Sequence, residues 1–146
     1  MNRNSFIIIC LSLFLVTSLS ANPPKKHANG EGIKFFEGTF TQALAKAKAE
    51  KKLIFLDAYT SWCGPCKAMQ ARTFPDKKLG EYFNQKFVSI KIDMEEGEGP
   101  GLSETYGVTA YPTLFFIDAS GKVAKRVLGF HSAEKLLSQA QSVGGK

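Results

Sequence analysis

Two cysteines separated by two residues constrain this chain more than any other feature. Cys63 and Cys66 follow the apolar run 53–56 and open a stretch with helical composition. Their i, i+3 spacing places both sulfur atoms on one turn of helix, where they can close a small disulfide ring and reopen it without moving the fold. At a helix start, free backbone N–H groups and the helix dipole stabilise the thiolate of Cys63. The pattern therefore predicts a redox-active pair at a strand-to-helix junction.

The alternative for such a pair is half of a zinc site. A structural zinc ion needs four ligands. The chain has one further cysteine, Cys10, and its two histidines, His27 and His131, are far apart in the sequence. These residues do not complete a zinc site, so we expect no metal at Cys63 and Cys66.

The first 20 residues are typical of a secretory signal peptide. A positive charge at Arg3 precedes the apolar run 6–19, and small residues follow for cleavage near Ser20 or Ala21. The run is shorter than the roughly 18 to 20 residues that a membrane-spanning helix needs, although an uncleaved anchor remains the alternative. The segment predicts a periplasmic or otherwise exported protein that loses Cys10 on cleavage and keeps a single cysteine pair.

Length and composition indicate one domain. We divide the chain into a signal peptide over 1–20, a flexible Pro- and Gly-rich linker over 21–32 and one domain over 33–146. The roughly 125 residues left after cleavage are enough for a core without disulfide staples. The formal net charge is +6, but the lysines are spread along the chain rather than massed. We therefore expect no nucleic-acid partner.

Helix and strand signals alternate along the rest of the chain. Continuous apolar runs of strand length are typical of strands buried on both faces of a sheet, and apolar residues at helical spacing indicate helices. The turn 118–121 makes the last two strands an antiparallel hairpin. We expect strands at 33–36, 53–56, 87–93, 113–117 and 122–128, and helices at 40–51, 63–73, 76–84, 102–106 and 132–143.

Four separated features then agree in order with one family. The chain resembles the thioredoxin superfamily over 33–143: a strand that ends in Asp57, Trp-Cys-Gly-Pro-Cys-Lys at 62–67, Tyr-Pro-Thr at 111–113, and Gly129 before the last helix. Its exported address and the stretch 57–63 resemble the secreted thioredoxin-like proteins of Gram-negative bacteria more than the cytoplasmic thioredoxins. The resemblance implies an α/β fold, with a central mixed β-sheet flanked by helices on both faces.

The resemblance assigns roles to the residues around the pair. Cys63 would be the nucleophile whose thiolate attacks a substrate disulfide, and Cys66 would be the more buried thiol that resolves the mixed disulfide. Pro65 would stiffen the turn, and Gly64 would admit close approach of a substrate chain. Trp62 would shield the pair on one side.

Asp57 matches the buried acid that the family places beneath the pair. A buried carboxylate has a raised pKa, which suits proton exchange with Cys66 during resolution. The alternative is an aspartate at a strand end that faces solvent. Ser89 stands where cytoplasmic thioredoxins have a lysine near this acid, which leaves the tuning of Asp57 open.

Pro112 matches the cis-proline of the family, whose loop faces the disulfide and pairs with the substrate backbone. Only about 5% of X–Pro bonds in folded proteins are cis, so the family match carries this prediction. Tyr111 should lie next to Cys63, where cytoplasmic thioredoxins carry a smaller aliphatic residue. It either shapes substrate choice, through its ring or a hydrogen bond to sulfur, or is a packed tyrosine without such a role.

The acidic, Gly-rich loop 94–101 permits two interpretations. Together with Asp93 it offers four carboxylates, which is enough to consider a calcium site. The spacing of the carboxylates matches no known cation loop, and the glycine content favours a solvated connector. We expect the connector.

These features predict an exported thiol:disulfide oxidoreductase that reduces protein disulfides, because Gly-Pro between the cysteines is the dipeptide of the reducing branch of the family. The implied partners are disulfide-containing exported proteins and a membrane-embedded electron donor. We expect a monomer that needs no cofactor. The alternatives are a disulfide oxidase or isomerase, and a thioredoxin-fold binding module with little redox turnover.

Overall fold

The structure is a computed structural model that describes residues 31–144. The expected signal peptide and residues 21–30 of the expected linker lie outside the described residues. The helices are α1 (Phe40–Glu50), α2 (Gly64–Arg72), α3 (Lys77–Lys86), α4 (Gly99–Tyr106) and α5 (Ala133–Gly144). The strands are β1 (Leu53–Tyr59), β2 (Phe87–Asp93), β3 (Thr113–Ile117) and β4 (Val123–Leu128). Within 31–144, no helix is both long and apolar enough to cross a membrane.

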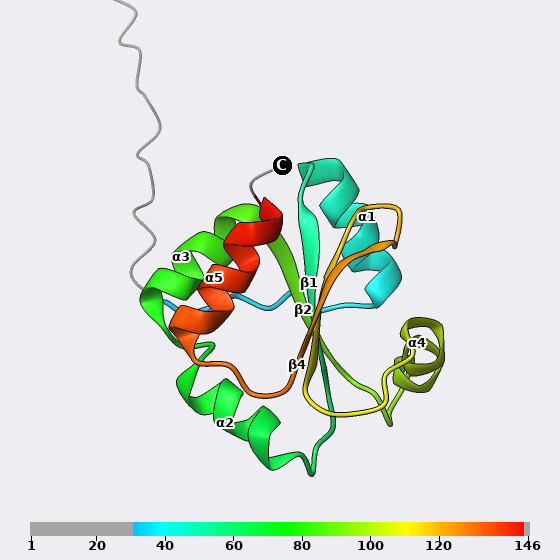
Figure 1. Ribbon diagram of the computed structural model, residues 1–146. Coiled ribbons are helices and arrows are strands. Elements are labelled where there is room, and N and C mark those ends of the chain that lie inside the picture. The colour runs from blue at the N-terminus through cyan, green and yellow to red at the C-terminus, as the bar shows by residue number, and fades with distance from the viewer. Residues whose placement is uncertain (1–30, 145–146) are drawn as a thin grey trace, which may run out of the picture.

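A mixed four-stranded sheet forms the centre, in the order β2-β1-β3-β4. β1 pairs in parallel with β2 and antiparallel with β3, and β4 pairs antiparallel with β3. Parallel neighbours need a crossover connection, which α2 and α3 supply between β1 and β2. Helices cover both faces of this sheet, so the predicted fold class is confirmed (Figure 1).

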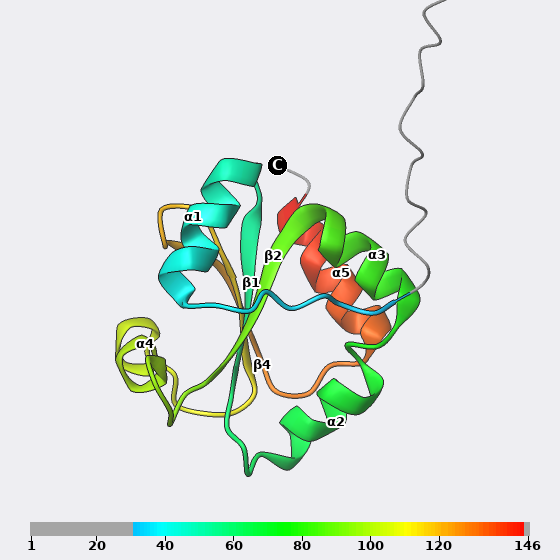
Figure 2. The ribbon, with the colours of Figure 1, turned by 180° about the vertical axis from the view of Figure 1, so that it is seen from behind.

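The two faces of the sheet have separate cores. α1 and α4 lie on one face, whereas α3 and α5 lie on the other, with α2 at the lower end of the view (Figure 1 and Figure 2). β1 serves both cores, because successive side chains of a strand point to opposite faces. Ile54, Leu56 and Ala58 join the core under α1, and Phe55 joins the aromatic core under α3 and α5.

Local sequence explains where the helices begin. Thr39 and Gln42 form a reciprocal capping box at the start of α1. Asp76 accepts a hydrogen bond from the N–H of Leu79 at the start of α3, at 2.9 Å. The side chain of Ser132 accepts one from the N–H of Lys135 in the first turn of α5, at 3.4 Å. Each cap satisfies a backbone donor that the helix itself leaves unpaired.

The first predicted strand is wrong. The segment 33–36 makes a single β-bridge, between Phe35 and Ser89. The N–H of Ile33 donates instead to the carbonyl of Phe74 at 2.8 Å. The segment therefore passes from the α2–α3 connection to the edge of β2, and it forms no continuous ladder with either.

α4 begins three residues before the helix that was predicted at 102–106. Pro100 lies in its first turn, where the missing N–H of proline removes no helical hydrogen bond. Gly99 is buried against the backbone of Asp93, and a side chain at this position would collide with it. Part of the predicted connector 94–101 is therefore helical.

Candidate active site

The two cysteines form a disulfide at the N-terminus of α2. Cys63 is the N-cap residue, and the Cα atoms of Cys63 and Cys66 lie 5.3 Å apart. The backbone N–H of Cys66 donates a hydrogen bond to the Sγ of Cys63 at 3.2 Å. Both residues are buried in this oxidised state, with exposed fractions of 3% and 1%. Exposure therefore does not separate the two sulfur atoms, but the N-cap position favours a thiolate at Cys63 after reduction.

The two residues between the cysteines form the start of α2. Gly64 and Pro65 are exposed. Apart from its chain neighbours and the backbone of its own helix, no atom of the described residues lies within 4 Å of the place where a Cβ on Gly64 would stand. The N–H that Pro65 lacks is one that a helix start leaves unpaired, so proline fits here without loss. The exposed part of this turn is therefore Gly64 and Pro65, whereas the two cysteines are buried in the oxidised state.

Asp57 is buried on the face of the sheet on which α2 packs. Its exposed fraction is 1%, and neither carboxylate oxygen has a hydrogen-bond partner within 31–144. Burial raises the pKa of Asp57 to about 7, while the charge of Lys91 acts in the opposite direction. Asp57 shares its face of β1 with Phe55. Phe55 belongs to the core cluster that also contains Met69 of α2, about one turn after Cys66. The alternative of a solvent-facing aspartate is wrong.

Lys91 is a neighbour of Asp57 that the sequence did not reveal. The two residues are register partners on the parallel strands β1 and β2, so their side chains share one face of the sheet. Ser89 lies one strand period earlier on the same face and is buried, with a hydroxyl that has no partner among the described residues. Lys91 itself is exposed. A lysine therefore does stand beside the acid, two residues after the position that the family pattern uses.

The peptide bond between Tyr111 and Pro112 is cis, as the resemblance implied. Thr113 pairs with Ala58 of β1, which places the buried Pro112 beside the end of β1, where the chain turns toward α2. The N–H of Gly129 donates to the carbonyl of Pro112 at 2.8 Å. This hydrogen bond fixes the proline loop to the end of β4.

Trp62 precedes Cys63 and is 63% exposed. Its indole Nε1 donates a hydrogen bond to Oε2 of Glu95 at 2.9 Å. Its ring packs edge to face on Tyr111, with centroids 5.9 Å apart. Tyr111 thus contacts the residue next to Cys63 through its ring. Nothing in the sequence singles out Glu95, because this contact depends on how two loops approach each other.

The structure brings the residues singled out in the sequence to one end of the sheet. Asp57 lies buried in β1, and the others belong to the β1–α2 turn, the first turn of α2 and the loop before β3. These others are Trp62, Cys63, Gly64, Pro65, Cys66, Tyr111 and Pro112.

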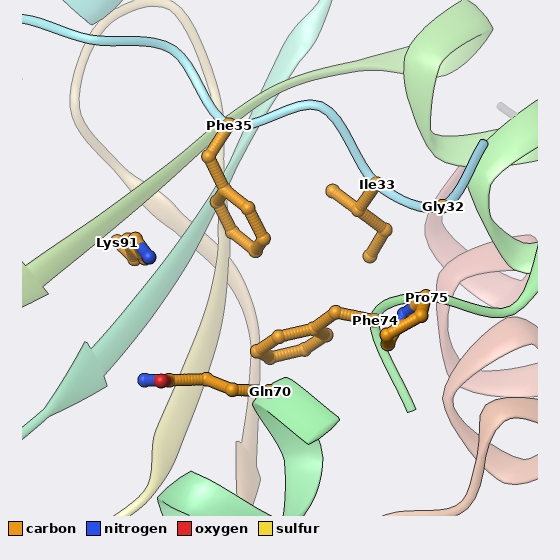
Figure 3. Close-up of a pocket in the computed structure, with 7 residues that line it drawn as sticks. All are labelled: Gly32, Ile33, Phe35, Gln70, Phe74, Pro75 and Lys91. Atoms are coloured by element: carbon orange, nitrogen blue, oxygen red, sulfur yellow. The ribbon is translucent and has the colours of Figure 1, made fainter. Parts of the chain in front are cut away.

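A cavity of about 240 Å³ opens next to Lys91 (Figure 3). Phe35 and Phe74 converge on it, with ring centroids 5.2 Å apart in an edge-to-face arrangement. The polar ends of Gln70 and Lys91 both lie on the left side of the view (Figure 3). The ammonium of Lys91 is 5.8 Å from the centroid of Phe35. Two aromatic rings and two polar side chains therefore line this cavity, on the face of the sheet that carries Asp57.

Comparison with known proteins agrees with this site. Residues 40–144 match the family model of the thioredoxin-like domain. The chain belongs to the thioredoxin superfamily. A solution structure of a candidate disulphide-isomerase from Bacteroides thetaiotaomicron is similar to this thioredoxin-like chain, with 46% identity and a TM-score of 0.70. The match covers 82% of this chain and 98% of the other.

The second group of similar proteins carries the name DsbD. The thiol:disulfide interchange protein DsbD from Pseudoalteromonas atlantica is 28% identical over 131 residues, which is 87% of this chain and 22% of that protein. The chain thus spans about a fifth of the length of this relative. The oxidised C-terminal domain of DsbD from Neisseria meningitidis shares 25% identity at a TM-score of 0.60, over 70% of this chain and 90% of that domain. The relatives of this thioredoxin-like chain are thiol:disulfide oxidoreductases.

Proposed function

We propose that this chain is an exported thiol:disulfide oxidoreductase that reduces disulfides of exported proteins. The observation that carries the proposal is the closed pair Cys63–Cys66 at the N-terminus of α2. A loop with a cis-proline and a strand with a buried carboxylate at the same end of the sheet support it. Gly64 and Pro65 between the cysteines support the reducing direction, since they match the reducing branch of the superfamily.

In the reaction, Cys63 acts first. Its thiolate attacks one sulfur of a client disulfide, so that a mixed disulfide forms and the other client sulfur leaves as a thiolate. Cys66 then attacks the Sγ of Cys63, which restores the internal disulfide and releases the second client thiolate. Two electrons pass to the client and two protons follow from the dithiol and solvent. Ionised Asp57 accepts the proton of Cys66 as it attacks.

Export and partners are part of this proposal. The signal-like segment 1–20 supports cleavage near Ser20 or Ala21. The mass of the intact secreted protein would show where cleavage occurs. An oxidising compartment drives the pair to the disulfide, so turnover requires a membrane-embedded electron donor. A Cys66→Ser variant would hold clients and donor as mixed disulfides for identification. A binding module without redox turnover would accumulate none.

A second candidate function is disulfide isomerisation. It is favoured by the 46% identical solution structure, which is named a candidate disulphide-isomerase. Both functions use Cys63 as the attacking sulfur, but they differ in the redox state that must prevail. A reductase is re-reduced after each cycle, whereas an isomerase regains its dithiol when the client rearranges.

The reduction potential of the pair decides between these functions. We would equilibrate the domain in dithiol buffers and follow Trp62 fluorescence. A reductase is expected near the thioredoxin value of about −270 mV, whereas an isomerase or oxidase lies at about −180 to −120 mV. A value in the second range would contradict the proposed direction. The absence of any reversible transition would contradict the redox function altogether.

A further inference from the structure

Trp62 connects three loops around the disulfide. It belongs to the β1–α2 turn, its Nε1 reaches Glu95 in the loop after β2, and its ring meets Tyr111 in the loop before β3. The side chain is nevertheless 63% exposed. An exposed aromatic ring without such partners would sample several rotamers. The two contacts therefore give the ring one position beside Cys63.

The carboxylate of Glu95 is presented from a fixed backbone. The N–H of Glu95 donates to Oδ1 of Asp93 at 3.0 Å. The preceding residue, Met94, is 3% exposed, and its N–H donates to the carbonyl of Tyr59 at 2.8 Å. These bonds hold the loop against the end of β1. The backbone of Glu95 is therefore held independently of Trp62, so its carboxylate can restrain the indole ring.

We propose that Glu95 is a positioning residue, which holds Trp62 as the aromatic wall that an extended client chain contacts when its disulfide reaches Cys63. The inference rests on the proposed exchange with protein disulfides. The hydrogen bond has a charged acceptor and is stronger than a neutral one. Glu95 contacts no reacting sulfur, so its loss changes client binding and leaves the transfer between sulfur atoms in place.

Steady-state reduction of a disulfide-bonded protein such as insulin tests this role. Glu95→Ala is expected to raise KM about threefold to tenfold, with kcat within about twofold of wild type. Glu95→Gln keeps an acceptor oxygen and should raise KM less. Glu96 is the matched control, because it is exposed and acidic but its side chain has no hydrogen bond or ion pair among the described residues. Equal KM values for Glu95→Ala and Glu96→Ala would overturn the proposal.

A double-mutant cycle shows whether the effect passes through the indole. Trp62→Phe keeps a ring but removes the Nε1 donor. In that background, Glu95→Ala should change KM no further, because its partner is already absent. Additive effects of the two substitutions would overturn the proposal, since Glu95 would then act on clients by another route.

Fluorescence gives a test that needs no turnover. Trp62 is the single tryptophan of the chain. Time-resolved anisotropy should show a larger fast component in Glu95→Ala than in wild type or Glu96→Ala, and identical decays would contradict the positioning role. If wild type reduced no protein disulfide, the proposed function would fail while this comparison still tested the role of Glu95.

Discussion

The two faces of the sheet differ in what the central strands place on them. Toward α1 and α4, β1 and β2 contribute only apolar side chains, namely Ile54, Leu56, Ala58, Val88, Ile90 and Ile92. Toward α2, α3 and α5, the same strands contribute polar groups as well as aromatic rings. The polar residues on that face include Asp57, Ser89 and Lys91, and the aromatic ones include Phe55 and Phe87.

The polar groups also lack partners. The buried side-chain oxygens without a hydrogen bond among the described residues belong to Asp57 and Ser89 on this face, and to Thr60 just after β1. Burying such groups costs free energy, and a fold that served stability alone would avoid it. The face toward α1 and α4 therefore shows what this sequence does for stability, and we propose that the other face carries its polar groups for the redox site.

The largest expected effect on stability comes from placing a polar group on the face of the sheet toward α1 and α4. Leu56→Asn removes a fully buried side chain and buries an amide among apolar neighbours. We expect a loss of about 5 kcal/mol in the free energy of unfolding, measured by urea denaturation at pH 8. A loss under about 2 kcal/mol would contradict the difference between the faces.

An asparagine at the next position, in place of Asp57, should instead stabilise the folded protein at high pH. The pKa of Asp57 rises from 3.8 to about 7 on folding, so the folded state binds the proton more tightly than the unfolded chain. Stability therefore falls as the pH rises from 3.8 to about 7, and above that range the buried carboxylate is ionised.

Asp57→Asn removes this cost. The variant should be more stable than wild type at pH 8, on the order of 4 kcal/mol at about 1.4 kcal/mol per pKa unit. The advantage should vanish near pH 4. Urea denaturation of both proteins across this range measures it, and an advantage that did not depend on pH would show that ionisation is not its cause.

The smallest effect concerns the lysine beside the acid. The charge of Lys91 lowers the pKa of Asp57. Lys91→Met should therefore move the titration of Asp57 to higher pH, as followed by carboxyl NMR shifts. Lys122→Met, an exposed lysine at the β3–β4 hairpin, serves as control and should leave the titration unchanged. A shift of the same size in both variants would mean that the net charge of the protein, and not the position of Lys91 beside Asp57, changes the pKa of Asp57.

The sequence predicted the redox end of the fold well, because local signals define it. β2 and β3 run over the predicted residues 87–93 and 113–117, since alternating or continuous apolar runs mark both. The cysteine pair lies at the predicted start of α2. The cis-proline followed from the family match and not from any local preference.

The sequence did not predict features that depend on how segments approach each other. Lys91 is beside Asp57 because of the register of two parallel strands, which no single strand encodes. Glu95 meets Trp62 because two loops converge. The segment 33–36 looked like a strand by composition, but its hydrogen bonds divide between two partners.

Separate measurement of the two exchange steps tests the account most directly. Stopped-flow kinetics would give the rate at which Cys63 forms a mixed disulfide with a client and the rate at which Cys66 resolves it. For Asp57→Ala the account predicts resolution slowed at least about tenfold, with formation within about twofold of wild type. Equal slowing of both steps would contradict the role of Asp57 as the group that takes the proton of Cys66.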